Sequence, residues 1–153
     1  MIQPKWFTPV ACVIFYRRNV SHLEFLLGKR KEKEAYGGKW GLVGGSGAFW
    51  EGAENPLDFA IREAVYDLKI AVDPERLQYF TEKIKCSRTS LILEIYFSYE
   101  LEAGQEVEVT GNDKAPDNCR WFSMEEMIAM WQRGEIAFNN HEVLQEFSSR
   151  DGL

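Results

Sequence analysis

Two acidic residues four positions apart, Glu63 and Asp67, are the strongest candidates for chemistry in this chain of 153 residues. In a helix this spacing places both carboxylates on one face, about one turn apart. Two unpaired carboxylates at that distance repel each other, and no structural need explains the arrangement. A hard cation such as Mg²⁺ removes the repulsion, because it prefers carboxylate oxygens and completes its shell with water and phosphate. The pair therefore indicates a divalent-metal site.

Residues upstream of this pair strengthen the interpretation. Glu54 stands eight residues before Arg62, where a carboxylate favours the helix dipole and can pair with an arginine that folds back. Gly44 and Gly45 belong to a glycine-rich turn, whose backbone N–H groups can approach phosphate oxygens closely. Taken alone, each feature has an ordinary explanation, because charged helix faces are usually solvated and glycines interrupt many loops. Their combination, in this order, favours phosphate chemistry.

The acidic pair depends on one predicted amphipathic helix. Asn55 supplies a cap residue and Pro56 a first helical residue whose missing N–H costs nothing. Apolar residues then recur at helical spacing and predict one stripe facing a core, formed by Leu57, Ala60, Ile61, Ala64 and Leu68. The opposite side carries Arg62, Glu63, Tyr66 and Asp67.

Strands are predicted on both sides of this helix. Thr8 to Tyr16 and Glu24 to Arg30 should form a hairpin around the polar turn at Arg17 to Asn19. Leu77 to Lys85 and Ser90 to Glu102 should form a second pair, and Arg120 to Phe122 a short last strand. Residues 31–39 and 104–118 are polar and predict loops.

One predicted strand, Ser90 to Glu102, is long and largely apolar, so we expect it to be central. Glu94 interrupts it, and a carboxylate inside such a run needs a partner or a metal.

Short helices complete the predicted fold. Ser123 should cap a helix from Met124 to Trp131, with Glu126 completing a capping box. A last helix should begin at Asn139 or Asn140 and run to about Ser148. The order of strands, one amphipathic helix, strands and short helices predicts an α+β domain with a mixed sheet over residues 1–153.

Composition narrows the classes of function. With 45% hydrophobic and 14% aromatic residues the chain can form a real core, and no apolar run is long enough to span a bilayer. Without a signal-peptide pattern, we expect a soluble cytoplasmic protein. A net charge of −6 disfavours duplex nucleic acid, although metal ions could mask it locally for a small anionic substrate. The same composition is compatible with a homodimer.

The three cysteines, Cys12, Cys86 and Cys119, are far apart and form no zinc-binding pattern with the two histidines. We expect them to be reduced, buried or half-buried thiols.

The motifs together resemble the Nudix hydrolase family. Its members carry the box G-x5-E-x7-R-E-U-x-E-E-x-G-U, where U is a bulky apolar residue, often preceded by a tryptophan-glycine-leucine-proline-glycine-glycine strand end. This chain has WGLVGG at 40–45, then Glu54, seven residues, and REAVYDLKI from Arg62. GKR after the second strand and RWFSMEEM from Arg120 follow in the family's usual order, so the resemblance covers almost the whole chain.

The box is degenerate at four positions. Ala48 stands where the family has its first glycine, and Lys69 where it has its last. Tyr66 and Asp67 replace the terminal pair of glutamates. A tyrosine is a neutral phenol at pH 7 and a poor substitute for a carboxylate, whereas aspartate still binds Mg²⁺ with a shorter reach.

The resemblance implies a Nudix-like α/β/α sandwich with a mixed sheet and a loop–helix–loop, and a metal-dependent mechanism. Mg²⁺ or Mn²⁺ would bind Glu63 and Asp67 and neutralise charge on pyrophosphate oxygens while water attacks phosphorus. Glu63 in the box, or Glu94 outside it, would orient or deprotonate that water. Arg62 would orient Glu54 or Glu63 rather than contact the substrate.

Substrate contacts have less support from the sequence. Lys29, Arg30 and Lys39 could contact phosphates or could be ordinary solubilising charges. Phe49 and Trp50, in a loop that looks lengthened relative to the family, could stack a nucleobase or fold back over the core.

Two asparagines open the last predicted helix. Asn139 or Asn140 could bind a purine, as an asparagine near this place does in some relatives, or could simply cap the helix. We expect the adjacent His141 to be an exposed helix residue.

The leading prediction is therefore a nucleotide pyrophosphohydrolase that cleaves a nucleoside diphosphate linked to another moiety, first of all a nucleoside triphosphate. Nucleotide sugars, dinucleoside polyphosphates and capped RNA ends are alternative substrates. A second class of function is a nucleotide- or protein-binding domain with little or no hydrolysis, because Tyr66 and Lys69 alter the box. A third interpretation is an unrelated α+β protein in which Glu63 and Asp67 face no cleft.

Overall fold

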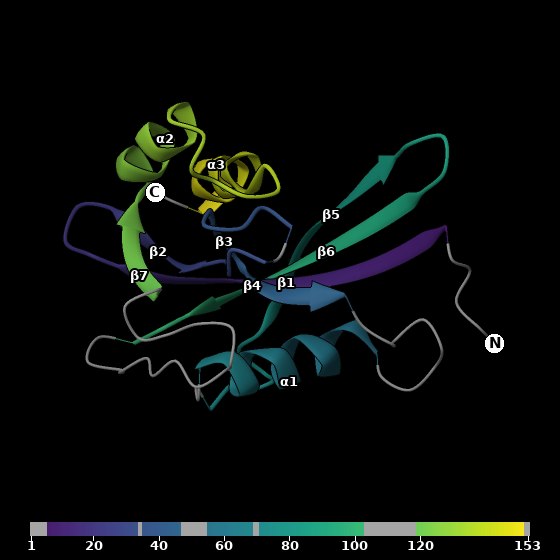
Figure 1. The fold of residues 1–153 in the computed structure, drawn as a ribbon. Helices are drawn as coiled ribbons and strands as arrows, with labels where there is room; N and C mark the ends of the chain where they lie inside the picture. Colours follow the sequence, from purple (N-terminus) through teal and green to yellow (C-terminus); the bar gives the residue numbers. More distant parts are fainter. Residues whose placement is uncertain (1–5, 34, 47–54, 69–70, 103–118, 152–153) are drawn as a thin grey trace.

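The computed structural model describes residues 6–33, 35–46, 55–68, 71–102 and 119–151, and for residues 45, 46, 66–68 and 151 it describes the backbone alone. Within these residues, seven strands form one sheet with helices on both faces. Helix α1 (Pro56–Leu68) covers one face, and α2 (Met124–Gln132) and α3 (Asn140–Asp151) lie on the other (Figure 1). The predicted α+β class with a mixed sheet is confirmed.

The sheet is built around its longest strand, β1 (Phe7–Arg18). On one side β1 runs parallel to β6 (Leu91–Glu100), which pairs antiparallel with β5 (Gln78–Cys86). The predicted central position of β6 is therefore confirmed, because it lies between two strands.

The other side of β1 is shared by two strands. Its C-terminal end forms the predicted hairpin with β2 (Leu23–Lys29), and its N-terminal half pairs antiparallel with β4 (Val43–Ser46). Strand β2 also pairs with the two short strands β3 (Trp40–Gly41) and β7 (Cys119–Ser123).

Side chains of β1 alternate between two cores, as the strand period of two requires. Ala11, Val13 and Phe15 pack with α1, and Ile14 belongs to the core beneath α2 and α3. Each position in the central strands is therefore assigned to one face, and this assignment decides which functional side chains can meet.

Helix α1 begins as the sequence predicts. The Asn55 side-chain oxygen accepts a hydrogen bond from the Asp58 N–H at 2.8 Å, which satisfies one of the free donors of the first turn. Phe59, Ala60 and Ala64 are buried and face the sheet, and α1 contacts β1, β4 and β6. Because two of these residues are alanines, the helix can lie close to the strands.

Helix α2 begins with the predicted capping box. The Ser123 hydroxyl accepts from the Glu126 N–H at 3.1 Å, and the Glu126 carboxylate accepts from the Ser123 N–H at 2.8 Å. Two donors are satisfied reciprocally, which fixes the point where β7 ends and the helix starts.

Two local predictions are corrected. Arg17 and Arg18 extend β1 instead of forming a turn, and the turn lies at Asn19, whose N–H and C=O both bond His22. Gly44 and Gly45 are strand residues opposite Cys12 and Ala11, because the whole of Val43–Ser46 pairs with β1.

The cysteines are free, as predicted, and Cys12 and Cys119 are half-buried. Cys86, however, is exposed, because it ends the edge strand β5. In the part of the chain that the structure describes, no helix is long and apolar enough to cross a membrane.

Candidate active site

The first part of the site is the exposed edge of α1. Because Ala60 and Ala64 face the sheet, Glu63 lies at the side of the helix, where 23% of its side chain is exposed. The Arg62 Nη1 atom lies 3.6 Å from Glu63 Oε1, and the Arg62 guanidinium carbon lies 5.1 Å from the Phe59 ring centroid. Arg62 thus contacts both Glu63 and the core residue that anchors the helix.

The structure describes only one side chain of the predicted metal-binding pair, that of Glu63. The backbone of Asp67 lies in α1, one turn after Glu63, but its side chain falls outside the described part of the structure. Glu54, Phe49 and Trp50 also lie outside the described residues. Among the described residues, no group of three or more His, Cys, Asp or Glu side chains is placed to hold a metal ion. Of the predicted pair, Glu63 is the described carboxylate, and a carboxylate of this kind suits a divalent cation that takes other ligands from water and phosphate.

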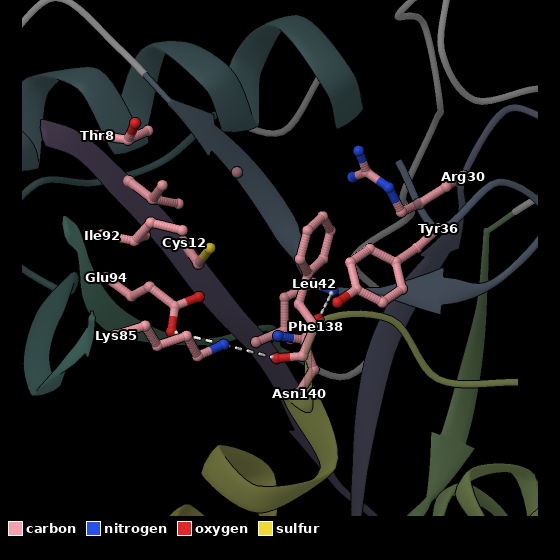
Figure 2. A pocket seen from close by; sticks show the side chains of 12 residues that line it. Thr8, Cys12, Arg30, Tyr36, Leu42, Lys85, Ile92, Glu94, Phe138 and Asn140 are labelled. Atoms are coloured by element: carbon pink, nitrogen blue, oxygen red, sulfur yellow. Dashed lines mark hydrogen bonds and ion pairs between the residues drawn. The ribbon is translucent and has the colours of Figure 1, made fainter. Parts of the chain in front are cut away.

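The second part is a cavity of about 380 Å³ on the opposite face of the sheet (Figure 2). Its base consists of alternate residues of β1 together with side chains of β5 and β6, and its wall of the loop before α3. The apolar lining includes Val10, Cys12, Leu42 and Ile92, and the polar lining includes Arg30, Lys85, Glu94 and Asn140. An apolar pocket with a few convergent polar groups is typical of a small-molecule site.

Strand β4 borders both parts of the site. Gly44 lines the cavity, while β4 contacts α1 on the other face. Gly44 has φ of 152°, and a Cβ atom there would collide with the Ala11 carbonyl oxygen. Only glycine allows β4 to approach β1 this closely beside the cavity.

Aromatic rings form one wall of the cavity. The ring centroids of Tyr36 and Phe138 are 4.5 Å apart, and the Arg30 guanidinium carbon lies 4.6 Å from the Phe138 centroid. The Arg30 Nε–H also donates to the Ala35 carbonyl at 2.7 Å, which fixes its orientation. The Lys39 ammonium lies 5.7 Å from the Tyr36 ring centroid, so it stands beside this wall.

The backbone of this wall is strained. Tyr36, Phe138 and Asn139 have φ of 59°, 57° and 58°, a left-handed conformation that is unfavourable for residues with side chains. Each such residue costs roughly 1–3 kcal/mol and persists where the surrounding structure holds it, often at a binding site. Two of the three residues are the facing rings of the cavity.

A charge pair between a buried carboxylate, Glu94, and a half-buried lysine, Lys85, lies in the base of the cavity. The Lys85 Nζ atom is 3.1 Å from Glu94 Oε1 and donates to the Phe138 carbonyl at 3.2 Å (Figure 2). The contact between Lys85 and Glu94 is an ion pair without hydrogen-bond geometry, and among the described residues the buried Glu94 Oε1 atom has no hydrogen-bond partner. Glu94 has the partner that its place in an apolar strand requires, but one of its oxygens still lacks a donor.

Tyr96 supports the Glu94 carboxylate from the same face of β6. Burial, most of all, raises the pKa of the Tyr96 hydroxyl above its usual value, and the charges of Cys12 and Glu94 and the hydrogen bond to Glu94 raise it further. The phenol therefore stays protonated and donates to Glu94.

Asn140 joins the cavity to β4. Its Oδ1 accepts from the Leu42 N–H at 3.0 Å, and the residue is only 4% exposed. The same Oδ1 atom would lie 3.0 Å from a Cβ atom at Gly41, so the glycine there gives the amide room. With Oδ1 used in this way, the Nδ2 group is the donor that Asn140 can offer to the cavity.

The structure therefore brings some predicted substrate-binding residues together and separates others. Arg30, Gly44 and Asn140 line the cavity, whereas Asn139 is exposed and does not.

The predicted phosphate contact Lys29 lies near Glu135 instead. The pKa of Glu135 is lowered, mainly by a hydrogen bond from Arg133 and further by the charges of Arg133 and Lys29. Lys29 thus lies within electrostatic reach of Glu135 and is not among the cavity-lining residues.

The prediction that His141 is exposed is wrong. Its ring is 4% exposed and stacks on Trp131, with centroids 4.4 Å apart and an interplanar angle of 20°. In the described part of the chain the buried Nδ1 atom has no hydrogen-bond partner, and burial lowers the pKa of the imidazole despite the charge of Glu142.

The aromatic and cationic cavity residues Tyr36, Lys85 and Phe138 were not predicted as site residues from the sequence. The sequence does contain an indication of Lys85, because this residue ends the strand that is predicted to pair with the strand of Glu94. Tyr36 and Phe138 lie in loops, where no periodicity indicates the direction of a side chain.

Comparisons with known proteins identify the family and the fold. A family model described as "NUDIX domain" matches residues 6–147, and the chain therefore belongs to the NUDIX family. The expected Nudix-like sandwich is the fold that the structure shows. A comparison with curated proteins finds no match.

Solved structures share the fold at low sequence identity. A MutT protein from Methanosarcina mazei Go1 has a TM-score of 0.72 at 17% identity, over 98% of this chain and 99% of that one. The NUDIX domain of Shewanella oneidensis NrtR, complexed with ADP ribose, has a TM-score of 0.73 at 14% identity, over 93% and 86%. A C. elegans Ap4A hydrolase in a binary complex has a TM-score of 0.69 at 18% identity, over 93% and 96%.

The chain spans about half the length of another neighbour with this fold, a MutT/nudix family protein from Enterococcus faecalis, of which it covers 46%.

Proposed function

We propose that this chain is a metal-dependent pyrophosphohydrolase that cleaves a nucleoside diphosphate linked to another moiety, with a nucleoside triphosphate as the first candidate. The observation that carries the proposal is that β4 borders both the cavity and the helix with the acidic residues. A ligand that places its base in the cavity and its phosphates toward α1 would use both parts. Membership of the NUDIX family supports this assignment.

The acidic residues of α1 would carry the chemistry. Glu63 and Asp67 would hold Mg²⁺ or Mn²⁺, which when bound neutralises charge on the pyrophosphate oxygens. The Glu63 carboxylate would orient the attacking water. Arg62, whose Nη1 atom lies 3.6 Å from Glu63 Oε1, would limit the orientations of this carboxylate. Arg62 is thus a positioning residue.

The cavity would bind the nucleobase, and the cationic side chains beside it would bind phosphates. Tyr36 and Phe138 offer ring faces for stacking, and base–aromatic stacking contributes about 1–3 kcal/mol per base. Arg30 and Lys39, beside these rings, supply positive charge in a chain whose net charge is −6. Glu94 lies on this face of the sheet, opposite to α1, so we assign it to substrate binding and not to water activation.

The moiety beyond the diphosphate has two main alternatives. ADP ribose in the NrtR complex supports a nucleotide sugar, and the Ap4A hydrolase supports a dinucleoside polyphosphate. Both share a base and a diphosphate with a nucleoside triphosphate, so the same cavity and helix would serve all three.

A second candidate function is nucleotide binding with weak or no hydrolysis. Tyr66 takes the place of a box carboxylate, so the helix offers one carboxylate ligand fewer than the family's box. The cavity would then bind a ligand without the chemistry of α1.

A panel of nucleotides with Mg²⁺ or Mn²⁺, separated by chromatography, tests hydrolysis. We expect turnover of at least one nucleoside diphosphate derivative, and Glu63→Gln should reduce it by about 10²-fold or more, because the carboxylate would lose its roles toward metal and water. Asp58→Asn is the matched control, since Asp58 is exposed on the first turn of the same helix, and it should retain the wild-type rate.

The two candidate functions give different results in this experiment. Nucleotide binding without any turnover would favour the binding domain. If Glu63→Gln hydrolyses nucleotides as fast as the wild type, α1 does not carry the chemistry and the proposed mechanism fails.

A further inference from the structure

The most informative group in the cavity is the carboxylate of Glu94. The residue is 6% exposed and lines the cavity, and its buried Oε1 atom, 3.1 Å from Lys85 Nζ, accepts no hydrogen bond from the residues that the structure describes. A buried oxygen of this kind is costly unless a ligand supplies the missing donor. Figure 2 shows Glu94 and Lys85 side by side at the base, across from Phe138 and Asn140.

The neighbours of Glu94 hold the carboxylate in place but use only part of its capacity to accept hydrogen bonds. Lys85 provides the countercharge at 3.1 Å but spends one of its N–H bonds on the Phe138 carbonyl. Tyr96 donates one hydrogen bond to Glu94. A carboxylate has about four lone-pair sites, so it can still accept two donors from a ligand in the cavity.

The cavity also contains hydrogen-bond donors in fixed positions. Asn140 can offer its Nδ2 group, because Oδ1 accepts from Leu42 N–H, and Lys85 has N–H groups beyond the one that it donates to the Phe138 carbonyl. The cavity therefore presents a fixed acceptor pair next to one or two fixed donors. A complementary ligand has two adjacent N–H groups beside a carbonyl oxygen.

From this pattern we infer that the cavity selects guanine, with Glu94 as the specificity-determining residue. The inference rests on the proposed function, because it takes the cavity as the site of the base. Guanine presents N1–H and the 2-amino group side by side to the carboxylate, and its O6 accepts from Asn140 or Lys85.

The other bases do not match the carboxylate in this way. Hypoxanthine keeps N1–H but lacks the second donor. Adenine and cytosine place an unprotonated ring nitrogen beside their amino group, and uracil flanks its single N–H with two carbonyl oxygens. Each of these would leave a lone pair facing Glu94 or a buried carboxylate oxygen unpaired, and sites built on hydrogen bonds reject such analogues strongly.

Nucleoside monophosphates in chelator test base selection without metal, turnover or α1. ¹⁵N-labelled wild-type protein is titrated with GMP, IMP, AMP, CMP and UMP, and dissociation constants are taken from amide shift changes. We expect GMP to bind on the order of tenfold more tightly than IMP, which lacks one N–H donor to a charged acceptor. AMP, CMP and UMP should bind more weakly than IMP.

A matched pair of variants links the preference to one side chain. Glu94→Gln replaces one acceptor oxygen with an NH₂ group, so GMP should lose its advantage and bind within about threefold of AMP. Glu82→Gln makes the same change at an exposed position of the adjacent strand β5 and should keep the wild-type preference. The wild-type series alone decides the question if Glu94→Gln does not fold.

The outcomes separate this inference from the proposed function. Binding of all five nucleotides without a preference for GMP would overturn guanine selection and leave the hydrolase proposal intact. Hydrolysis of nucleotides by a protein whose cavity amides do not shift with any monophosphate would also overturn it, because the base would bind elsewhere. Absence of both binding and hydrolysis would remove both proposals.

Discussion

The two faces of the sheet differ in how completely they are filled. On the α1 face, Ala60 and Ala64 are fully buried and bring the helix against the strands. On the other face, α2 and α3 cover the C-terminal half of β1, where Ile14 enters their core, while Thr8 and Val10 face the cavity instead (Figure 1).

The difference suggests a division of roles. A closely packed helix can fix the direction of Glu63 because its backbone cannot shift without repacking the core. The partly uncovered face can accept a ligand. The strand residues at the bottom of the cavity and the polar groups around it are already in place. Changes on the α1 face should therefore alter stability and catalysis together, and changes in the cavity should alter binding alone.

The largest effect on stability is expected for Ala64→Leu. Ala64 is fully buried against the sheet, so the larger side chain must push α1 away or adopt a strained rotamer. We expect a loss of about 1–3 kcal/mol in the free energy of unfolding, measured by urea denaturation, together with slower hydrolysis.

Val65→Leu is the control for this change. Val65 is the next residue of the helix and is 46% exposed, so its substitution should change stability by less than about 0.5 kcal/mol. Equal stability of Ala64→Leu and the wild type would mean that α1 is not closely packed, and the contrast between the faces would fail.

Much of the α1 face could be predicted from the sequence, because its signals are local. Asn55 and Pro56 mark the start of the helix, and the spacing of the buried alanines marks its inner side. Ser123 and Glu126 likewise fix the start of α2. In each case the determining atoms lie within four residues of one another.

The cavity could be predicted only in fragments, because its parts are distant in sequence. Glu94 was identified as a carboxylate that needs a partner, but the partner Lys85 follows from the β5–β6 register. Phe138 and Asn140 reach the cavity because the segment before α3 pairs with Trp40. Such long-range pairings depend on tertiary packing, which no local pattern encodes.

A smaller effect on stability is expected from acid. Burial lowers the pKa of His141 below its ordinary value of 6.5, so the folded protein favours the neutral ring. As pH falls below 6.5, the unfolded chain binds the proton first and the folded state loses stability. Above this pH the contribution is constant. Urea midpoints between pH 8 and pH 5 should decline toward acid.

Two variants isolate the contribution of His141. His141→Phe keeps a ring against Trp131 but cannot titrate, so its decline toward acid should be shallower than that of the wild type. His22→Gln removes the other histidine, which is exposed, and should leave the wild-type decline unchanged. A decline that is the same in His141→Phe would assign the acid sensitivity to carboxylates instead.

The smallest effect on stability, and the most direct test of the open face, is expected for Ile92→Phe. Ile92 is a half-buried β6 residue that lines the cavity, so the added ring can occupy the cavity without displacing its neighbours. The free energy of unfolding should change by less than about 0.5 kcal/mol, while GMP binding should weaken by more than tenfold. Leu91→Phe, which adds the same ring on the opposite face of β6, should keep GMP binding. A marked loss of stability in Ile92→Phe would show that this face is already filled, and unchanged GMP binding would place the base outside the cavity.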